Sequence, residues 1–247
     1  MTIRVIFFDF GYVLASPPPG LDPRFLYLDW DGMAQIAADP LLTPSLRPGI
    51  GEAQLRTFFE REYYQRFTGP EANQLEAPRA NELMRAILPR IFARPLTNGQ
   101  YERLLFHLDT MKYMRFHPAA RRVLSALSNL NYKLGIISNM ILPGMLLERL
   151  LRSEGLREYF GPVITSSETG YIKPHPRIFE RALFAGEWRP EEALMVGDTY
   201  RQDIIGARTV GMRAVWLNCR GEPTAQAAQN PPDAIIQSLE ELLTMDL

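Results

Sequence analysis

Side chains capable of chemistry follow the apolar runs of this sequence, each at the point where a β-strand would end. Asp9 directly follows Val5–Phe8. Ser138 closes the run YKLGIIS, and Asn139 comes next. After a third apolar run, Lys173 stands in the loop GYIKPHP. A carboxylate, a hydroxyl group, an amide and a cation are thus placed at successive strand ends.

Two further acids follow the fourth apolar run, ALMV. This run leads into Gly197, Asp198 and Thr199, and Asp203 comes five residues after Asp198. Parallel strands bring their carboxyl ends to one edge of a sheet, where functional groups gather. We therefore expect Asp198 and Asp203 to lie close to Asp9.

This set of groups suits phosphoryl transfer through a carboxylate nucleophile. Asp9 would attack phosphorus, and a hard divalent cation held by Asp9 and Asp198 would offset the repulsion between that carboxylate and an anionic substrate. Oxygen ligands of this kind suit Mg²⁺. Ser138 can donate a hydrogen bond to a phosphate oxygen, and Lys173 adds a positive charge that holds Asp9 and the phosphate together.

Each of these residues, taken alone, has a structural explanation. An acid at a strand end is often a helix cap or a turn residue, and a serine such as Ser138 often caps a helix. Lys173 alone would be a solvated surface charge. Gly-Asp-Thr alone is a common turn. The order of these residues and their shared placement at strand ends favour a functional site.

The elements that must position these groups show an α/β pattern. Near-continuous apolar runs that alternate with helical stretches are typical of a parallel sheet covered on both faces. Val5–Phe8 is expected at the centre of this sheet. The other predicted strands are 132–138, 162–166, 193–196, 213–217 and 234–237, with helices near 118–129, 143–153, 176–185 and 201–210. Ser238 and Glu241 predict a capping box that opens a last short helix.

Residues 16–114 interrupt this pattern. They open with SPPPG, a stiff segment that continues neither a strand nor a helix. Apolar residues at helical spacing then predict helices within 51–67, 78–92 and 97–108, with a kink or break at Pro89. The predicted fold class is α/β: a Rossmann-like parallel sheet with helices on both faces, built from 1–15 and 115–247, and a helical insert at 16–114.

Composition excludes several classes of protein. A net charge of −1 over 247 residues gives no reason to expect nucleic acid or a membrane as partner. No apolar run approaches the ~18 residues needed to span a bilayer, and Asp9 interrupts the N-terminal run that resembles a signal peptide. The single Cys219 excludes an intrachain disulfide and is expected to fill space in the core. We expect a soluble, cytoplasmic protein.

The chain resembles the haloacid dehalogenase (HAD) superfamily of hydrolases at four motifs. The last is the most specific, because its glycine, both acids and the following GA-x-x-x-GM pattern fall in register. The helical insert is similar in position and character to the type-1 cap of that superfamily. The matching stretches are FFDFGYVL (7–14), LGIISN (134–139), GYIKPHPRIF (170–179) and VGDTYRQDIIGARTVGM (196–212).

The resemblance implies a role for each motif residue. Asp9 is implied as the nucleophile, while Ser138, Asn139 and Lys173 are implied to bind the substrate, a small phosphorylated metabolite. Lys173 also has the catalytic role of the lysine in the third motif.

The resemblance also implies a Mg²⁺ cofactor. Its implied ligands are Asp9, the backbone carbonyl of Gly11 and Asp198. Asp203 is implied to support the metal through water.

Gly11 departs from the usual family pattern. Family phosphatases usually carry a second Asp there, which acts as general acid and then as base. Some share the D-x-G-x-V/I motif found here, including relatives acting on sugar 1-phosphates. The resemblance therefore implies a hydrolase of phosphomonoesters, with sugar phosphates among the candidates. Since acid catalysis typically contributes ~10²–10⁴-fold, we expect a preference for better leaving groups.

Two alternatives stay open. A 2-haloacid dehalogenase also lacks the second Asp, because a halide needs no proton on leaving. Such an enzyme needs no metal, whereas Asp198 and Asp203 beside Asp9 favour a cation site. A non-catalytic protein that binds phosphate esters is the other alternative, and Gly11 is the only feature that supports it.

Other residues offer groups for catalysis or substrate choice. The histidines His107, His117 and His175 could replace the missing acid, although packing or helix capping is expected for the first two. Tyr12 is expected to face the site or the helical insert, or to pack under the flap of chain that follows the first strand. Candidates for substrate choice in the insert are Tyr27, Trp30, Tyr63, Tyr64, Arg24, Arg47, Arg56 and Arg61.

Overall fold

The main sheet is parallel, and β1 lies inside it. The computed structural model describes residues 2–22, 27–69, 75–223, 225, 227 and 230–246. Within these residues the strand order is β5-β4-β1-β6-β7-β8, with every neighbouring pair parallel. The strands are β1 (Val5–Phe8), β4 (Lys133–Ser138), β5 (Phe160–Thr165), β6 (Ala193–Gly197), β7 (Arg213–Leu217) and β8 (Ala234–Ile236). The predicted central place of Val5–Phe8 is confirmed.

Alternate residues of β1 supply two different apolar cores. Ile6 and Phe8 belong to the core that includes α6 (Ala120–Asn129) and α7 (Met145–Ser153). Val5 and Phe7 belong to the core that includes α9 (Pro176–Phe184) and α10 (Gly206–Thr209). All four side chains are fully buried. A strand buried on both faces must be apolar throughout, which explains the run VIFF and confirms the predicted α/β class.

Three predicted helices differ in detail from regular α-helices. The stretch 201–210 is a π-helix, Tyr200–Ile205, followed by α10. The helix within 78–92 is α4 (Ala80–Ile87), which ends before Pro89 and continues as a 3₁₀ turn, as predicted. The last helix is a 3₁₀ helix, Leu239–Thr244, and Ser238 and Glu241 form its predicted capping box.

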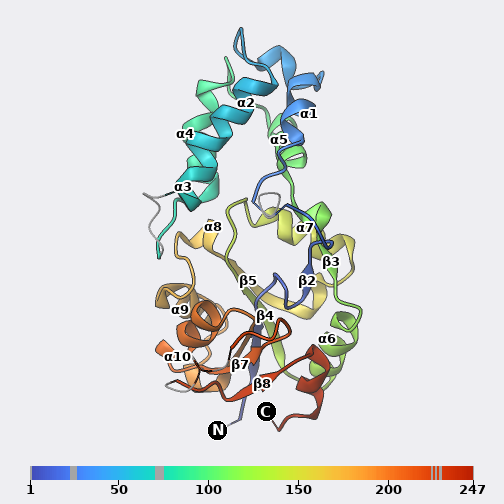
Figure 1. Ribbon diagram of the computed structural model, residues 1–247, viewed down its shortest axis with the longest axis vertical. Helices are drawn as coiled ribbons and strands as arrows, with labels where there is room; N and C mark the ends of the chain where they lie inside the picture. The colour runs from blue at the N-terminus through green and yellow to red at the C-terminus, as the bar shows by residue number, and fades with distance from the viewer. Residues whose placement is uncertain are drawn as a thin grey trace.

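The helices of the insert gather on the side of the molecule opposite the two chain ends (Figure 1). The stretch predicted as one helix at 51–67 is α2 (Glu52–Phe59) and α3 (Gln65–Thr68), joined by a π-helical turn. The third predicted helix is α5 (Asn98–Leu108). The short α1 (Gly32–Ala38) was not predicted, because seven residues hold too few turns to show a helical period. The domain boundaries at 15/16 and 114/115 stay a prediction.

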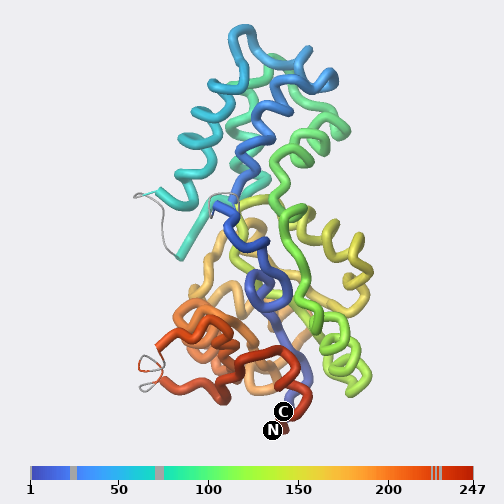
Figure 2. The backbone as a smooth tube through the Cα atoms, turned by 45° about the vertical axis from the view of Figure 1, so that its right-hand side comes forward, coloured from blue at the N-terminus to red at the C-terminus, as the bar shows by residue number. Residues whose placement is uncertain are grey.

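The two segments that cross between the insert and the main sheet run side by side (Figure 2). They form a second, antiparallel sheet of β2 (Ala15–Ser16) and β3 (Arg115–Phe116). The hydroxyl group of Ser16 lies 3.2 Å from Nε2 of His117. The crossing is therefore braced by backbone and side-chain contacts rather than by a single strand.

Two further observations bear on the sequence predictions. No helix in the described part of the chain combines the length and the apolar character that a bilayer crossing requires. The expectation that Cys219 fills the core is wrong, because the residue is exposed. It lies in the turn after the carboxyl end of β7 and outside the sheet.

Candidate active site

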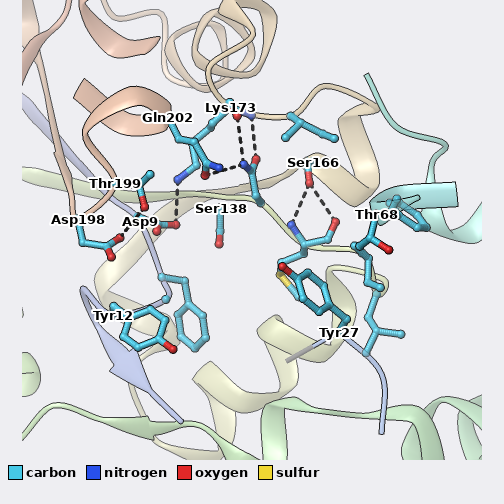
Figure 3. Close-up of a pocket in the computed structure, with 18 of the residues that line it drawn as sticks. Asp9, Tyr12, Tyr27, Thr68, Ser138, Ser166, Lys173, Asp198, Thr199 and Gln202 are labelled. Atoms are coloured by element: carbon cyan, nitrogen blue, oxygen red, sulfur yellow. Dashed lines mark hydrogen bonds and ion pairs between the residues drawn. The ribbon is translucent and has the colours of Figure 1, made fainter. Parts of the chain in front are cut away.

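A cavity of about 680 Å³ lies where the carboxyl ends of the strands face the insert. Figure 3 shows Asp9, Ser138, Lys173 and Asp198 together on one side of it, with Tyr27 across from them. The polar groups come from β1, β4 and β6 or from the loops that follow strands, so the strand-end argument correctly predicted where they meet. The insert contributes mainly apolar and hydroxyl side chains among the described lining residues: Pro17, Tyr27, Phe67, Thr68, Leu75, Thr110, Met111 and Met114.

Lys173 joins two of the acids. Its Nζ lies 2.9 Å from Oδ1 of Asp9 and 2.6 Å from Oδ1 of Asp203. The same ammonium group donates to the carbonyl of Ile137 at 2.9 Å, and the side chain is 1% exposed. Burial lowers the pKa of Lys173, but the charges of Asp203 and Asp9 offset this and raise it above its usual value. Lys173 is therefore a fixed cation beside Asp9.

Asp9, Asp198 and Asp203 form a cluster of acids. Each offers a carboxylate oxygen, and these atoms lie within 4.8 Å of one another. Burial, followed by the negative charges of Asp9 and Asp203, raises the pKa of Asp198 to about 7. Oδ2 of Asp198 is buried and has no aligned hydrogen-bond donor among the described residues, although it lies 2.8 Å from Nη2 of Arg220. Excess negative charge and a buried carboxylate oxygen without a hydrogen bond are the conditions that a bound cation relieves.

Asp203 is tied down by both of its oxygen atoms. Oδ1 accepts from Lys173, and Oδ2 accepts from the backbone N–H of Thr199 at 2.9 Å. Its side chain is 1% exposed. Asp203 therefore holds Lys173 in place, and metal binding by Asp9 and Asp198, supported by Asp203 through water, stays a prediction.

The side chains of Ser138 and Asn139 differ in whether they are available to bind a substrate. The hydroxyl group of Ser138 points into the cavity (Figure 3). The amide of Asn139 accepts from the backbone N–H of Lys173 at 2.8 Å and donates to the side chain of Gln202 at 3.1 Å. This arrangement favours a role for Asn139 in positioning the Lys173 loop, and its predicted contact with substrate stays a prediction.

Phe10, Gly11 and Tyr12, which follow the nucleophile candidate Asp9, all line the cavity. A Cβ at Gly11 would meet nothing within 4 Å, so the space usually taken by an acid is open. Tyr12 has a φ of 59°, a left-handed conformation that is uncommon for a bulky residue. Metal binding by the Gly11 carbonyl stays a prediction.

One protein-family model matches most of this chain. The model of the family described as haloacid dehalogenase-like hydrolase matches residues 51–217. The chain belongs to this family. The match includes the strands and loops that carry Ser138, Lys173, Asp198 and Asp203.

Curated relatives of this HAD-like hydrolase include several phosphatases. It is 44% identical over 114 residues to glyceraldehyde 3-phosphate phosphatase of Pyrococcus abyssi, covering 46% of this chain and 47% of the relative. It is 38% identical over 128 residues to pyrimidine 5′-nucleotidase YjjG of Escherichia coli, covering 51% and 54%. The chain thus spans about half the length of the curated relatives it matches.

Solved structures resemble this HAD-like hydrolase over nearly its whole length. A HAD phosphatase from Thermococcus onnurineus has a TM-score of 0.61 and 28% identity, over 99% of this chain and 97% of that one. A 2-haloacid dehalogenase from Pseudomonas syringae pv. Tomato has a TM-score of 0.59 and 22% identity, over 98% and 97%. The second likeness shows the fold alone.

The three histidines of this HAD-like hydrolase lie outside the cavity, since none is among its described lining residues. His107 contacts Asp39 at 2.7 Å within the insert, and His117 contacts Ser16. Nδ1 of His175 accepts from the backbone N–H of Arg177 at 3.1 Å. None of these contacts places an imidazole beside Asp9.

Of the residues predicted to select the substrate, some line the cavity and others do not. Tyr27 lines the cavity, whereas Trp30, Tyr63 and Tyr64 are not among its lining residues. The hydroxyl group of Tyr63 instead donates to the carbonyl of Ile141 and so joins the insert to the loop after β4. The predicted arginines Arg47, Arg56 and Arg61 are not among the lining residues either, and Arg24 lies outside the described residues.

Sequence reasoning missed several polar residues that line the cavity, namely Thr68, Thr110, Ser166, Arg201, Gln202 and Arg220. Arg220 lies in the turn that follows β7. The strand-end argument, applied to the fifth apolar run as well as to the first four, would have found it.

Proposed function

We propose that the chain is a Mg²⁺-dependent hydrolase of small phosphomonoesters that acts through an aspartyl-phosphate at Asp9. The observation that carries this proposal is the contact of 2.9 Å between Nζ of Lys173 and Oδ1 of Asp9, at the centre of an acid cluster. A buried cation fixed on one oxygen of a carboxylate lets the other oxygen approach an anionic phosphate. The phosphatases among the relatives support the same reaction class.

The acid cluster fits a magnesium ion. Asp9 and Asp198 would hold it, with the Gly11 carbonyl and a water positioned by Asp203 as further ligands. Carboxylate and carbonyl oxygens are the ligands that Mg²⁺ prefers. When bound, the metal would supply positive charge that offsets the repulsion between the carboxylates and the phosphate.

The reaction would proceed in two displacements. In the first, Asp9 attacks phosphorus, a bond forms between its oxygen and phosphorus, and the bond to the leaving oxygen breaks with its electron pair. Ser138 donates a hydrogen bond to a phosphate oxygen, and Lys173 offsets the charge that spreads over the phosphoryl group. In the second, water attacks phosphorus, releasing inorganic phosphate and restoring the carboxylate of Asp9.

Gly11 would restrict the range of substrates. Without a carboxylic acid beside the leaving oxygen, esters of weakly basic alcohols, such as sugar 1-phosphates, should react faster than ordinary alkyl phosphates. Equal rates across leaving groups of widely different pKa would contradict this expectation.

The test is phosphate release from a panel of phosphomonoesters, with and without Mg²⁺. We expect Mg²⁺-dependent turnover by wild type and a loss of at least ~10³-fold in Asp9→Asn, because a neutral amide replaces the nucleophilic carboxylate. Asp31→Asn, which changes an exposed acid of the insert, is the control and should keep wild-type activity.

Two results would refute the proposal in favour of its alternatives. Chloride release from a 2-chloro acid without Mg²⁺ would indicate a 2-haloacid dehalogenase. Saturable binding of phosphate esters without any hydrolysis would indicate a non-catalytic binding protein.

A further inference from the structure

Arg220 is held at the rim of the cavity by a tight turn after β7. The buried side chain of Asn218 donates to the carbonyl of Glu222 at 2.9 Å and accepts from its backbone N–H at 2.7 Å. Between them, Gly221 has a φ of 65°, and its N–H donates to the carbonyl of Asn218. The backbone on both sides of Arg220 is therefore fixed, and its side chain starts from a defined position.

The guanidinium of Arg220 reaches the acid cluster and Tyr12. Its Nη2 lies 2.8 Å from Oδ2 of Asp198 and 3.2 Å from Oε1 of Glu222. The group also lies over the ring of Tyr12, 5.1 Å from the ring centre, which is a favourable cation–π distance. Tyr12 directly follows Gly11, so this contact brings a positive charge next to the position that lacks an acid.

The left-handed backbone of Tyr12 supports a functional reading of this contact. A bulky residue with a φ of 59° stores strain, which persists only where the surrounding structure holds it. This conformation presents the Tyr12 ring to Arg220 at the cavity wall. The strained turn and the fixed turn after β7 thus meet beside Gly11.

Two other cations line the described part of the cavity wall, and neither is placed as Arg220 is. Lys173 is fully buried and committed to Asp9 and Asp203. Arg201 is exposed, on the helix after β6. Arg220 is the one of the three that contacts the residue adjoining Gly11.

We propose that Arg220 stabilises the negative charge on the leaving oxygen, the task left open at Gly11. This inference rests on the proposed phosphatase function. A guanidinium does not give up its proton at working pH, so Arg220 acts by charge and hydrogen bonding, and the leaving group takes its proton from water. A divalent cation bound at Asp198 would repel the guanidinium of Arg220 from Oδ2 of that residue. The N–H groups of Arg220 would then be available to the leaving oxygen.

The test compares wild type with Arg220→Met on aryl and alkyl phosphates of graded leaving-group pKa. We expect kcat to fall ~10²-fold or more for the poorest leaving groups and less than ~10-fold for 4-nitrophenyl phosphate, with a steeper dependence on leaving-group pKa. Guanidinium chloride at millimolar concentration should restore part of the activity of Arg220→Ala. Arg208→Met, which removes an arginine paired with Asp233 away from the cavity, should behave as wild type.

Calorimetric titration with Mg²⁺ gives a second readout that needs no turnover. We expect Arg220→Met to bind Mg²⁺ at least as tightly as wild type, because a competing cation has been removed from Asp198. Loss of Mg²⁺ binding in the variant would overturn the inference, since Arg220 would then act only by shaping the metal site.

The outcomes separate the inference from the function on which it rests. A wild type without activity on any phosphate ester would refute the proposed function and the inference with it. An active wild type with an Arg220→Met variant that loses the same factor on every substrate would refute the inference alone.

Discussion

Gly197 shows how one missing side chain allows the acid cluster to form. A Cβ at this position would fall 2.2 Å from Cβ of Asp203 and 2.4 Å from its Oδ2. Atoms that are not bonded cannot come this close, so only glycine lets Asp203 lie against the end of β6. Because Asp203 holds Lys173, and Lys173 lies on Asp9, the effect of this contact extends to the proposed nucleophile.

We predict that Gly197→Ala displaces Asp203 and lowers kcat by ~10²-fold or more, since a shift of about 1 Å in a catalytic group can cost that much. The measurement is steady-state phosphate release at saturating substrate. Gly161→Ala in β5 is the matched control, because its added Cβ has nothing nearer than 3.7 Å. Wild-type kcat in Gly197→Ala would show that Asp203 does not position Lys173.

At the scale of elements, the insert is tied to the loop that carries Lys173. The N–H of Ala77 donates to the carbonyl of Gly170 at 3.0 Å, and the N–H of Ile172 donates to the carbonyl of Leu75 at 2.8 Å. These bonds form a short antiparallel bridge directly before Lys173. The position of the insert and the position of Lys173 are therefore coupled through backbone contacts.

The packing of α1 on α5 inside the insert depends on Gly32. A Cβ there would lie 1.8 Å from the backbone oxygen of His107. We predict that Gly32→Ala destabilises the protein by roughly 1–3 kcal/mol, as is usual for overpacking of a tight contact.

Urea denaturation followed by circular dichroism measures this effect. Gly99→Ala in α5 is the matched control, since its Cβ would meet nothing within 4 Å and a helical alanine is favoured by about 0.5–1 kcal/mol over glycine. If both variants had equal stability, the close approach of α1 and α5 would not be required.

At the scale of the whole molecule, Glu192 links the N-terminus to the start of β6. Its carboxylate accepts from the backbone N–H of Arg189 at 2.9 Å and lies 3.3 Å from Nη1 of Arg4. The hydrogen bond from the Arg189 backbone, followed by its guanidinium and that of Arg4, lowers the pKa of Glu192 to about 2.

This shift predicts a pH dependence of stability. A depressed folded-state pKa contributes stability that is present above the unfolded value of about 4.5 and is lost as pH falls toward about 2. We expect Glu192→Gln to be less stable than wild type at pH 7 and the difference to shrink between pH 5 and pH 2. Urea midpoints across this range measure it. Ile236→Val, which titrates nothing, should differ from wild type by a similar amount at each pH.

Prediction from sequence succeeded where one residue and its neighbours carry the signal. The run VIFF is apolar on both faces and could only be an inner parallel strand, and the capping pair Ser238 and Glu241 is local by nature. Prediction was incomplete where structure departs from regular periods, as in the π-helix that carries Asp203 and in the short α1. It was wrong for Cys219, because a hydrophobic residue type does not reveal that its strand has already ended.

The positions of the strands along the chain and the residues at their ends could be predicted from the sequence, since apolar runs and the groups that follow them are local features. The order of the strands in the sheet came from the structure. The contacts of two side chains became known only from the folded structure. The amide of Asn139 hydrogen-bonds the backbone of Lys173, and the guanidinium of Arg220 lies close to both Asp198 and Tyr12. Both depend on contacts between residues far apart in sequence. The tertiary structure sets such distances, and the residue types alone do not.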